Sequence, residues 1–165
     1  MNESIDFLNE LRKLEGLECW GVVAGEGTGT RVSLDFGQKI SRKGSSNNPL
    51  LSEVLRHYTG EFSVFIRECA WRLESDQTLC TWKSPNANDG EMIRCLQGLV
   101  GRCVTRVSVA SPAFDLVIEF SGDLKLSLFC DCFDEKNDGS NYSFHNLNNI
   151  YVVRARSQLT RESKS

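Results

Sequence analysis

The sequence predicts an α+β protein, built mainly of antiparallel strands in two repeat-like halves with two or three short helices. Short segments in which apolar and polar residues alternate predict strands with one buried face. Segments after Ser4 and before Gly98 instead repeat apolar residues at three- and four-residue spacing, which is typical of amphipathic helices. The order helix, strand, turn and strand occurs twice along the chain, and this repetition predicts the two halves.

The clearest strands lie between Gly101 and Cys132. Three alternating segments follow one another there, separated by turn residues at 111–112 and 121–123. The apolar positions of these segments are Val107 and Val109, then Leu116, Ile118 and Phe120, then Leu124, Leu126 and Leu128. We therefore expect three consecutive strands that share one buried face.

The remaining elements follow from similar patterns. In the first part of the chain we expect a helix over 4–15 with Ser4 as its N-cap, a hairpin of strands over 17–24 and 30–40, and a polar loop over 41–49. A short helix over 49–58 follows the loop. Later in the chain we expect a returning strand over 77–83, a helix capped by Asn88, and two short strands over 142–144 and 150–153. A long strand is expected from Glu61 to Glu74. Its alternation changes phase between Ile66 and Trp71, which predicts a bulge or bend near 67–69.

The two halves share a pattern around a glycine. Leu14-Glu15-Gly16 corresponds to Leu99-Val100-Gly101, and the strand 32–36 resembles the strand 116–120, with an acidic residue before Phe in both. Either a unit was duplicated, or amphipathic strands resemble one another because sheets require alternation. We expect the halves to span residues 1–84 and 85–155 and to pack as one unit, followed by a frayed tail over 156–165.

Composition limits the classes of function. The 165 residues are 40% hydrophobic and 25% charged, with a formal net charge of −3. These values are typical of a globular protein, and they argue against nucleic-acid binding and against a membrane protein. The polar, acidic start of the chain lacks the features of a secretory signal, so we expect a cytoplasmic protein. The seven cysteines are then expected to be reduced and to pack as small apolar side chains.

Three stretches resemble chemical motifs but fail their requirements. The glycine-rich turn 25–30 is followed by a strand, whereas phosphate-binding loops precede a helix. The acidic loop 131–141 lacks the carboxylates that calcium loops carry at their third and twelfth positions. Cys130 and Cys132 have no second cysteine pair to complete a zinc site. Together with the lack of a nucleophile motif around His57 or His145, this predicts no catalytic residue, no metal and no cofactor.

The strand RECAWRLE gives the one candidate binding surface. It combines aromatic and guanidinium groups, which are enriched at binding hot spots. The candidate binding residues are Arg67, Trp71, Arg72 and Glu74, joined by Asp115 and the 41–49 loop. The alternative is a strand with Trp71 in the core and an ion pair on the surface.

Several segments also resemble a known group of proteins. These are FGQKISR, NPLLS, GEF, WRLE, LQGLVG and DLVIEF, distributed over residues 14–155. They are similar to segments of small bacterial proteins with a duplicated α+β domain, of the kind that also occurs among immunity proteins of contact-dependent toxin systems. The resemblance implies a toxin-like protein partner and an immunity role.

The sequence as a whole therefore favours a non-catalytic cytoplasmic protein that binds another protein and is of the immunity type. The alternative is a small-ligand-binding protein or a hydrolase with a carboxylate-lined site between the two halves. No nucleic-acid or membrane partner is expected. The oligomeric state stays open, with a homodimer among the options.

Overall fold

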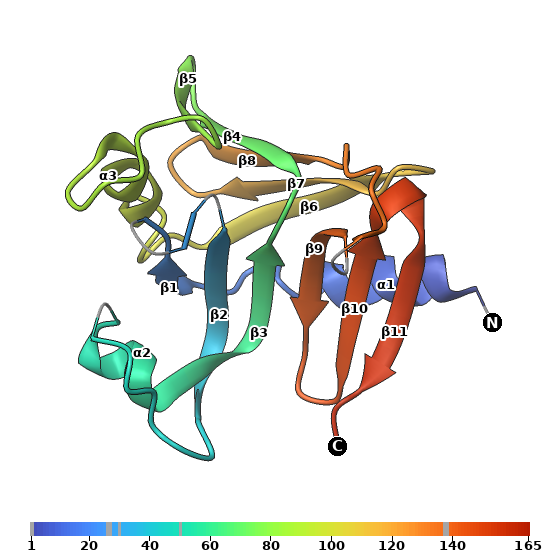
Figure 1. Cartoon of the computed structure of the whole chain (residues 1–165), viewed down its shortest axis with the longest axis horizontal. Coiled ribbons are helices and arrows are strands. Elements are labelled where there is room, and N and C mark those ends of the chain that lie inside the picture. The colour runs from blue at the N-terminus through green and yellow to red at the C-terminus, as the bar shows by residue number, and fades with distance from the viewer. Residues whose placement is uncertain (1, 26–27, 30, 50, 137–138) are drawn as a thin grey trace.

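The computed structural model describes residues 2–25, 28–29, 31–49, 51–136 and 139–165. It confirms the α+β class, with two antiparallel sheets and three short helices (Figure 1). In spatial order the six-stranded sheet contains β1 (Cys19–Val23), β2 (Val32–Ser41), β3 (Tyr58–Ile66), β9 (Ser140–His145), β10 (Asn149–Arg154) and β11 (Leu159–Ser163). The five-stranded sheet contains β5 (Thr78–Thr81), β4 (Ala70–Glu74), β8 (Leu124–Phe129), β7 (Asp115–Phe120) and β6 (Val104–Ala110).

The core lies between the two sheets. It is formed by the apolar positions of the alternating strands, and Phe36 of β2 stacks there on Phe120 of β7 with ring centroids 6.4 Å apart. Helix α1 (Glu3–Arg12) packs against β6 and β11, and α3 (Glu91–Gln97) packs against β5. The two helices therefore close the sides of the space between the sheets, as Figure 1 shows.

The helix ends differ slightly from expectation. The side chain of Asn2, rather than that of Ser4, caps α1, because its Oδ1 accepts a hydrogen bond from the Ser4 amide at 3.1 Å. Helix α3 begins after Gly90 rather than Asn88, and it ends at Gly98 as predicted. Helix α2 (Glu53–His57) is a single turn, shorter than predicted, and it follows a loop at 42–49.

Equivalent segments of the two halves pair with each other about a local twofold axis. The Gly16 amide donates to the Val104 carbonyl, and the Gly101 amide donates to the Cys19 carbonyl, both at 2.8 Å. Between these bonds, Glu18 forms a bridge with Cys103. Each hydrogen bond thus has a counterpart in which the two segments exchange roles, and Gly16 and Gly101 share a positive φ of 87°. The correspondence between the two Leu-x-Gly segments is therefore structural.

The strands that follow keep the same correspondence. A bulge separates Cys19 from Gly21 in β1, and the matching bulge separates Val104 from Arg106 in β6. Phe36 lies opposite Cys19, and Phe120 lies opposite Val104. The copies differ in the next connection, because β7 and β8 are joined by a tight turn whereas β2 and β3 are joined by a long segment that carries α2.

The predicted strand from Glu61 to Glu74 is two strands in two different sheets. Strand β3 ends at Ile66, the chain crosses at 67–69, and β4 pairs with β8 of the five-stranded sheet. After β8 the chain crosses back, and β9 pairs with β3. The phase change in the sequence marks this crossing rather than a bulge, because each strand turns its apolar face toward the same core from opposite sheets. Residues 1–84 therefore contribute strands to both sheets.

The end of the chain is ordered, which corrects the expected frayed tail over 156–165. Strand β11 pairs antiparallel with β10, from Asn149 opposite Ser163 to Val153 opposite Leu159. The short 3-10 helix Ala155–Ser157 makes the turn between these two strands, and Ala155 is buried. The guanidinium of Arg154 donates to Thr160 Oγ1 at 3.1 Å and thus ties the two strands together.

Candidate binding cleft

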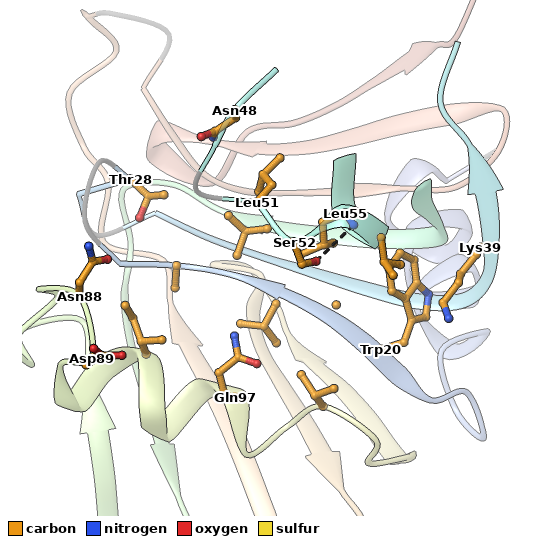
Figure 2. A pocket seen from close by; sticks show the side chains of 17 residues that line it. Trp20, Thr28, Lys39, Asn48, Leu51, Ser52, Leu55, Asn88, Asp89 and Gln97 are labelled. Atoms are coloured by element: carbon orange, nitrogen blue, oxygen red, sulfur yellow. Dashed lines mark hydrogen bonds between the residues drawn. The ribbon is translucent and has the colours of Figure 1, made fainter. Parts of the chain in front are cut away.

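A cleft of about 600 Å³ lies along β1, between α2 on one side and α3 on the other (Figure 2). Both walls of the β1 cleft, as we call it, carry apolar side chains beside polar ones: Leu51, Val54 and Leu55 from the α2 segment, and Ile93 and Val100 from the α3 segment. Val54 and Val100 are 43% and 41% exposed, although both are apolar. Because the long β2–β3 connection occurs in one copy only, this wall has no counterpart beside β6.

Next to α2, a buried carboxylate joins β2 to β3, and a glycine in β1 leaves room for the helix. Asp35 is only 3% exposed, and its Oδ1 accepts hydrogen bonds from the Gly60 amide (2.9 Å) and the Ser63 hydroxyl (2.7 Å). Gly21 lies beside Asp35, and a Cβ there would come within 3.0 Å of Leu55 Cδ2. Glycine therefore allows α2 to pack directly on β1.

The ends of α2 are held by side-chain hydrogen bonds. Ser52 Oγ accepts from the Leu55 amide at 3.3 Å and caps the helix, as the dashed line in Figure 2 shows. At the other end, the Arg42 guanidinium donates to the carbonyls of Leu55 (3.1 Å) and Tyr58 (3.3 Å). A helix of one turn is not stable by itself in water, so these hydrogen bonds and the burial of Leu55 hold α2 in the wall of the cleft.

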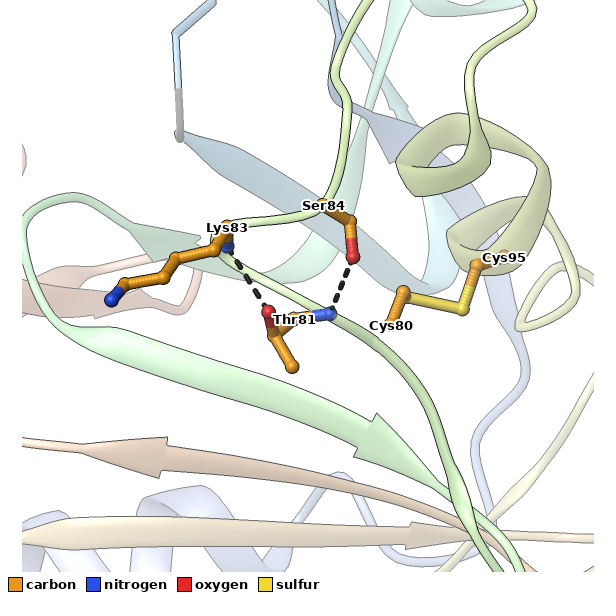
Figure 3. The surroundings of a disulfide bond; sticks show 5 residues. All are labelled: Cys80, Thr81, Lys83, Ser84 and Cys95. Atoms are coloured by element: carbon orange, nitrogen blue, oxygen red, sulfur yellow. Dashed lines mark hydrogen bonds between the residues drawn. A yellow bond between two sulfur atoms is a disulfide. The ribbon is translucent and has the colours of Figure 1, made fainter.

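The α3 wall is fixed by a disulfide bond between Cys80 of β5 and Cys95 of α3 (Figure 3). Their Cα atoms are 6.4 Å apart, within the usual range for such a bond. The chain after β5 turns toward α3 through hydrogen bonds of Thr81, whose amide donates to Ser84 Oγ at 2.9 Å. The disulfide therefore connects one edge of the five-stranded sheet to the helix that lines the cleft.

This disulfide corrects the expectation that all seven cysteines are reduced. The other five are free, and burial raises the pKa of the Cys19 and Cys69 thiols to about 12, so both are neutral packing groups. Sequence spacing alone did not reveal the Cys80–Cys95 pair. Because disulfides are rare in reducing compartments, the bond also weakens the basis on which a cytoplasmic protein was expected.

The floor of the cleft is an open strand edge. Strand β1 is the first strand of its sheet, and the segment 102–104 covers its other side only at Cys19. The direction of the β1 amides can be inferred from the equivalent strand β6 of the second copy. There the Val107 amide points away from β7 and donates to Glu15 Oε1 at 3.1 Å. Val22 holds the same place after the same bulge in β1. The amide of Val22 therefore faces the cleft.

Other donors lie near this edge. Trp20 Nε1 is buried and has no hydrogen-bond partner in the described part of the chain. Lys39 Nζ lies 5.4 Å from the centroid of the Trp20 ring, and the residues that the structure describes form no ion pair with it. Among the described lining residues Asp89 is the one carboxylate, and Figure 2 shows it at the end of the cleft opposite Trp20 and Lys39.

The candidate binding residues from the sequence do not form one surface. Trp71 is 1% exposed in the core, so it cannot contact a partner in this structure. Arg72 Nε lies 3.2 Å from Glu74 Oε2 in an ion pair on the other side of β4, which matches the alternative weighed for this strand. Arg67, in the crossing segment, stacks on the ring of Phe65 in β3. Asp115 accepts a hydrogen bond from the Cys130 amide at 2.7 Å, a structural contact.

The remaining polar candidates offer no accessible reactive group. Ser143 Oγ lies 2.9 Å from His145 Nε2, but Ser143 is buried. Burial, with Lys164 and Arg67 nearby, lowers the pKa of His145 to about 4, so this ring is neutral at pH 7. Among the described residues no group of three or more His, Cys, Asp or Glu side chains is placed to hold a metal; Asn137 and Asp138 of the acidic loop lie outside them.

Comparison with family models, curated proteins and solved structures returns no match for this chain. The resemblance to immunity proteins therefore stays a hypothesis. No helix within the described ranges is long and apolar enough to cross a membrane.

The pattern shared by the two halves contains one signal for the cleft. Leu14-Glu15-Gly16 corresponds to Leu99-Val100-Gly101, so Glu15 and Val100 hold equivalent positions in the two copies, although one is acidic and the other apolar. The structure shows what this difference means, because Glu15 covers an outward amide and the side chain of Val100 cannot. No pattern in the sequence indicated Trp20 and Lys39.

Proposed function

We propose that this is a non-catalytic protein that binds an extended segment of a partner protein in the β1 cleft. The observation that carries the proposal is an open strand edge between two walls that each present apolar side chains, with Val54 and Val100 exposed on either side. Extended segments bind in such places because main-chain groups supply hydrogen bonds and the walls accept alternate side chains. A volume of about 600 Å³ accommodates a few side chains of such a segment.

A partner protein is also favoured over a small substrate. The alternative function needs a carboxylate-lined site between the halves, and the described lining residues of the cleft supply Asp89 alone. The charged groups Lys39 and Asp89 lie at opposite ends, which suits a ligand that spans the cleft. The immunity-type role belongs to the same proposal, with a toxin-like protein as the source of the segment.

A displayed library of random peptides, selected against the immobilised protein, tests this proposal. We expect selected peptides to bind, and Val54→Asp to weaken their binding by at least about tenfold, because it places a charge against an apolar contact. Leu147→Asp is the matched control, since Leu147 is also an exposed apolar residue but lies outside the cleft. Recovery of no peptide, or equal binding by the Val54→Asp protein, would contradict the proposal.

The immunity-type role has its own experiment. If a toxin gene lies beside the gene for this protein, coexpression should restore growth, and Val54→Asp should abolish the protection while Leu147→Asp keeps it. Protection that survives Val54→Asp would place toxin binding elsewhere on the molecule.

A further inference from the structure

We infer that the bound segment carries an acidic side chain, whose carboxylate accepts a hydrogen bond from the Val22 amide. This inference rests on the proposed function and specifies what the β1 cleft recognises. Its basis is the second copy of the repeat, in which the equivalent amide of Val107 is bonded to the carboxylate of Glu15 at 3.1 Å. The molecule thus contains, in its own chain, an example of the ligand group that the first copy lacks.

The missing group can be traced to one residue. Glu15 follows α1 and precedes Gly16, and Val100 follows α3 and precedes Gly101 in the same conformation. Because Val100 has no acceptor atom in its side chain, it cannot repeat the contact of Glu15. It lines the cleft instead, and its side chain is partly exposed. A carboxylate from outside can occupy the corresponding place beside Val22.

The surroundings of this place favour an anion. Trp20 lies two residues before Val22 and has an unpartnered buried Nε1 donor, and Lys39 adds a positive charge over the same indole ring. Lys39 is thus the one charged lining residue at this end of the described cleft, and a hydrogen bond to a carboxylate is stronger than one to a neutral acceptor. Asp89, at the other end, repels a second acid and so fixes the direction of the segment.

Peptides selected against the protein provide the first test. We expect them to share an Asp or Glu at one position, and replacing this acid by Asn or Gln should weaken binding about tenfold, because the charge-assisted bond and the attraction to Lys39 are lost. Lys39→Met should weaken the acidic peptide and have little effect on its amide version. If both versions bind equally, the inference is wrong while the proposed function stands, since the segment then reaches Val22 through a main-chain carbonyl.

A second test needs no ligand. Val100→Glu should supply the carboxylate within the chain, slow the hydrogen exchange of the Val22 amide and block the selected peptides. Val100→Leu is the control of similar bulk without an acceptor, and it should leave the Val22 exchange rate unchanged. Unchanged exchange in the Val100→Glu protein, measured by NMR on a folded sample, would overturn the assigned geometry. Failure to select any peptide would overturn the proposed function together with this inference.

Discussion

Strands β1 and β6 are equivalent in the two copies, but their free edges have different surroundings. Beside β6, α1 packs closely and Glu15 bonds the outward amide of Val107. Beside β1, α3 and the added helix α2 leave a cleft that Val22 lines, and no glutamate follows α3 at the place that Glu15 holds after α1. Segments that are alike in the two copies form the core, and segments that differ form the cleft beside β1. The differences are therefore the places to examine for function.

The strongest test of the equivalence lies in the core. Phe36 and Phe120 are 0% and 2% exposed and stack on each other, so Phe36→Ala and Phe120→Ala should each lower the free energy of unfolding by about 3–5 kcal/mol. Urea denaturation measures both. Because the rings touch, the double variant should lose less than the two single losses together. A small loss at one position only would show that the copies do not share the core equally.

The next largest effect concerns how each helix is attached. Cys95 of α3 is bonded to Cys80, whereas Glu10, the equivalent residue of α1, accepts a hydrogen bond from Asn146 at 2.7 Å. Replacing both Cys80 and Cys95 by Ala should lower the free energy of unfolding by about 3 kcal/mol, given the 15-residue separation of the pair. It should also weaken peptide binding, since α3 forms a cleft wall. Cys103→Ala, which removes an exposed free thiol, should change neither property.

One group on the outer face of the six-stranded sheet, His145, makes the stability depend on pH. The Arg72–Glu74 pair lies on β4, and at the equivalent place β9 carries Ser143 and His145. Burial lowers the pKa of His145 from 6.5 to about 4, so protonation favours the unfolded chain. The stabilisation is complete above about pH 6.5 and is lost as the pH falls toward 4, by about 2 kcal/mol at pH 5.

Thermal unfolding between pH 7 and pH 4.5 measures this loss. In His145→Gln the corresponding part of the pH dependence should disappear, because the amide does not titrate. Glu74→Gln, at the equivalent position of the other sheet, should leave the His145 contribution in place. An unchanged pH profile in His145→Gln would show that another group causes the acid sensitivity.

The smallest effect concerns the covered edge itself. Glu15→Ala should remove the acceptor of the Val107 amide, lower the free energy of unfolding by about 1 kcal/mol and raise the exchange rate of this amide toward that of Val22. Glu18→Ala is the control, because Glu18 is exposed and pairs with Cys103 through its main chain only. Equal exchange at Val107 in both variants would mean that the two edges never differed in this respect.

Local patterns in the sequence were sufficient to predict most strands and the repeat. Alternation places Leu116, Ile118 and Phe120 on a buried face, because successive side chains of a strand point to opposite faces and the apolar ones mark the buried face. The crossing at 67–69 was harder, since the phase change after Ile66 is the same for a bulge as for a move between sheets. Only partners distant in the sequence, here β8 and β9, distinguish these cases.

The cleft was less predictable than the fold because its parts come from separate elements. Trp20, Lys39 and Val100 lie on β1, on β2 and after α3, and none belongs to a recognisable motif. The disulfide likewise joins residues whose proximity follows from packing alone. Conversely, Trp71 has the residue type of a binding hot spot, but alternation with Leu73 already placed it on the core face.

The exchange of β4 and β9 between the sheets has a consequence for synthesis on the ribosome. When the first half of the chain has emerged, β3 lacks its neighbour β9, and β4 and β5 lack β8. The five-stranded sheet can be completed once β8 has left the exit tunnel, whereas the six-stranded sheet cannot be completed until the segment 140–163 has followed. Until then the nascent chain keeps one edge of β3 unpaired, in contact with chaperones or solvent, and completion of the six-stranded sheet depends on contacts between distant parts of the chain.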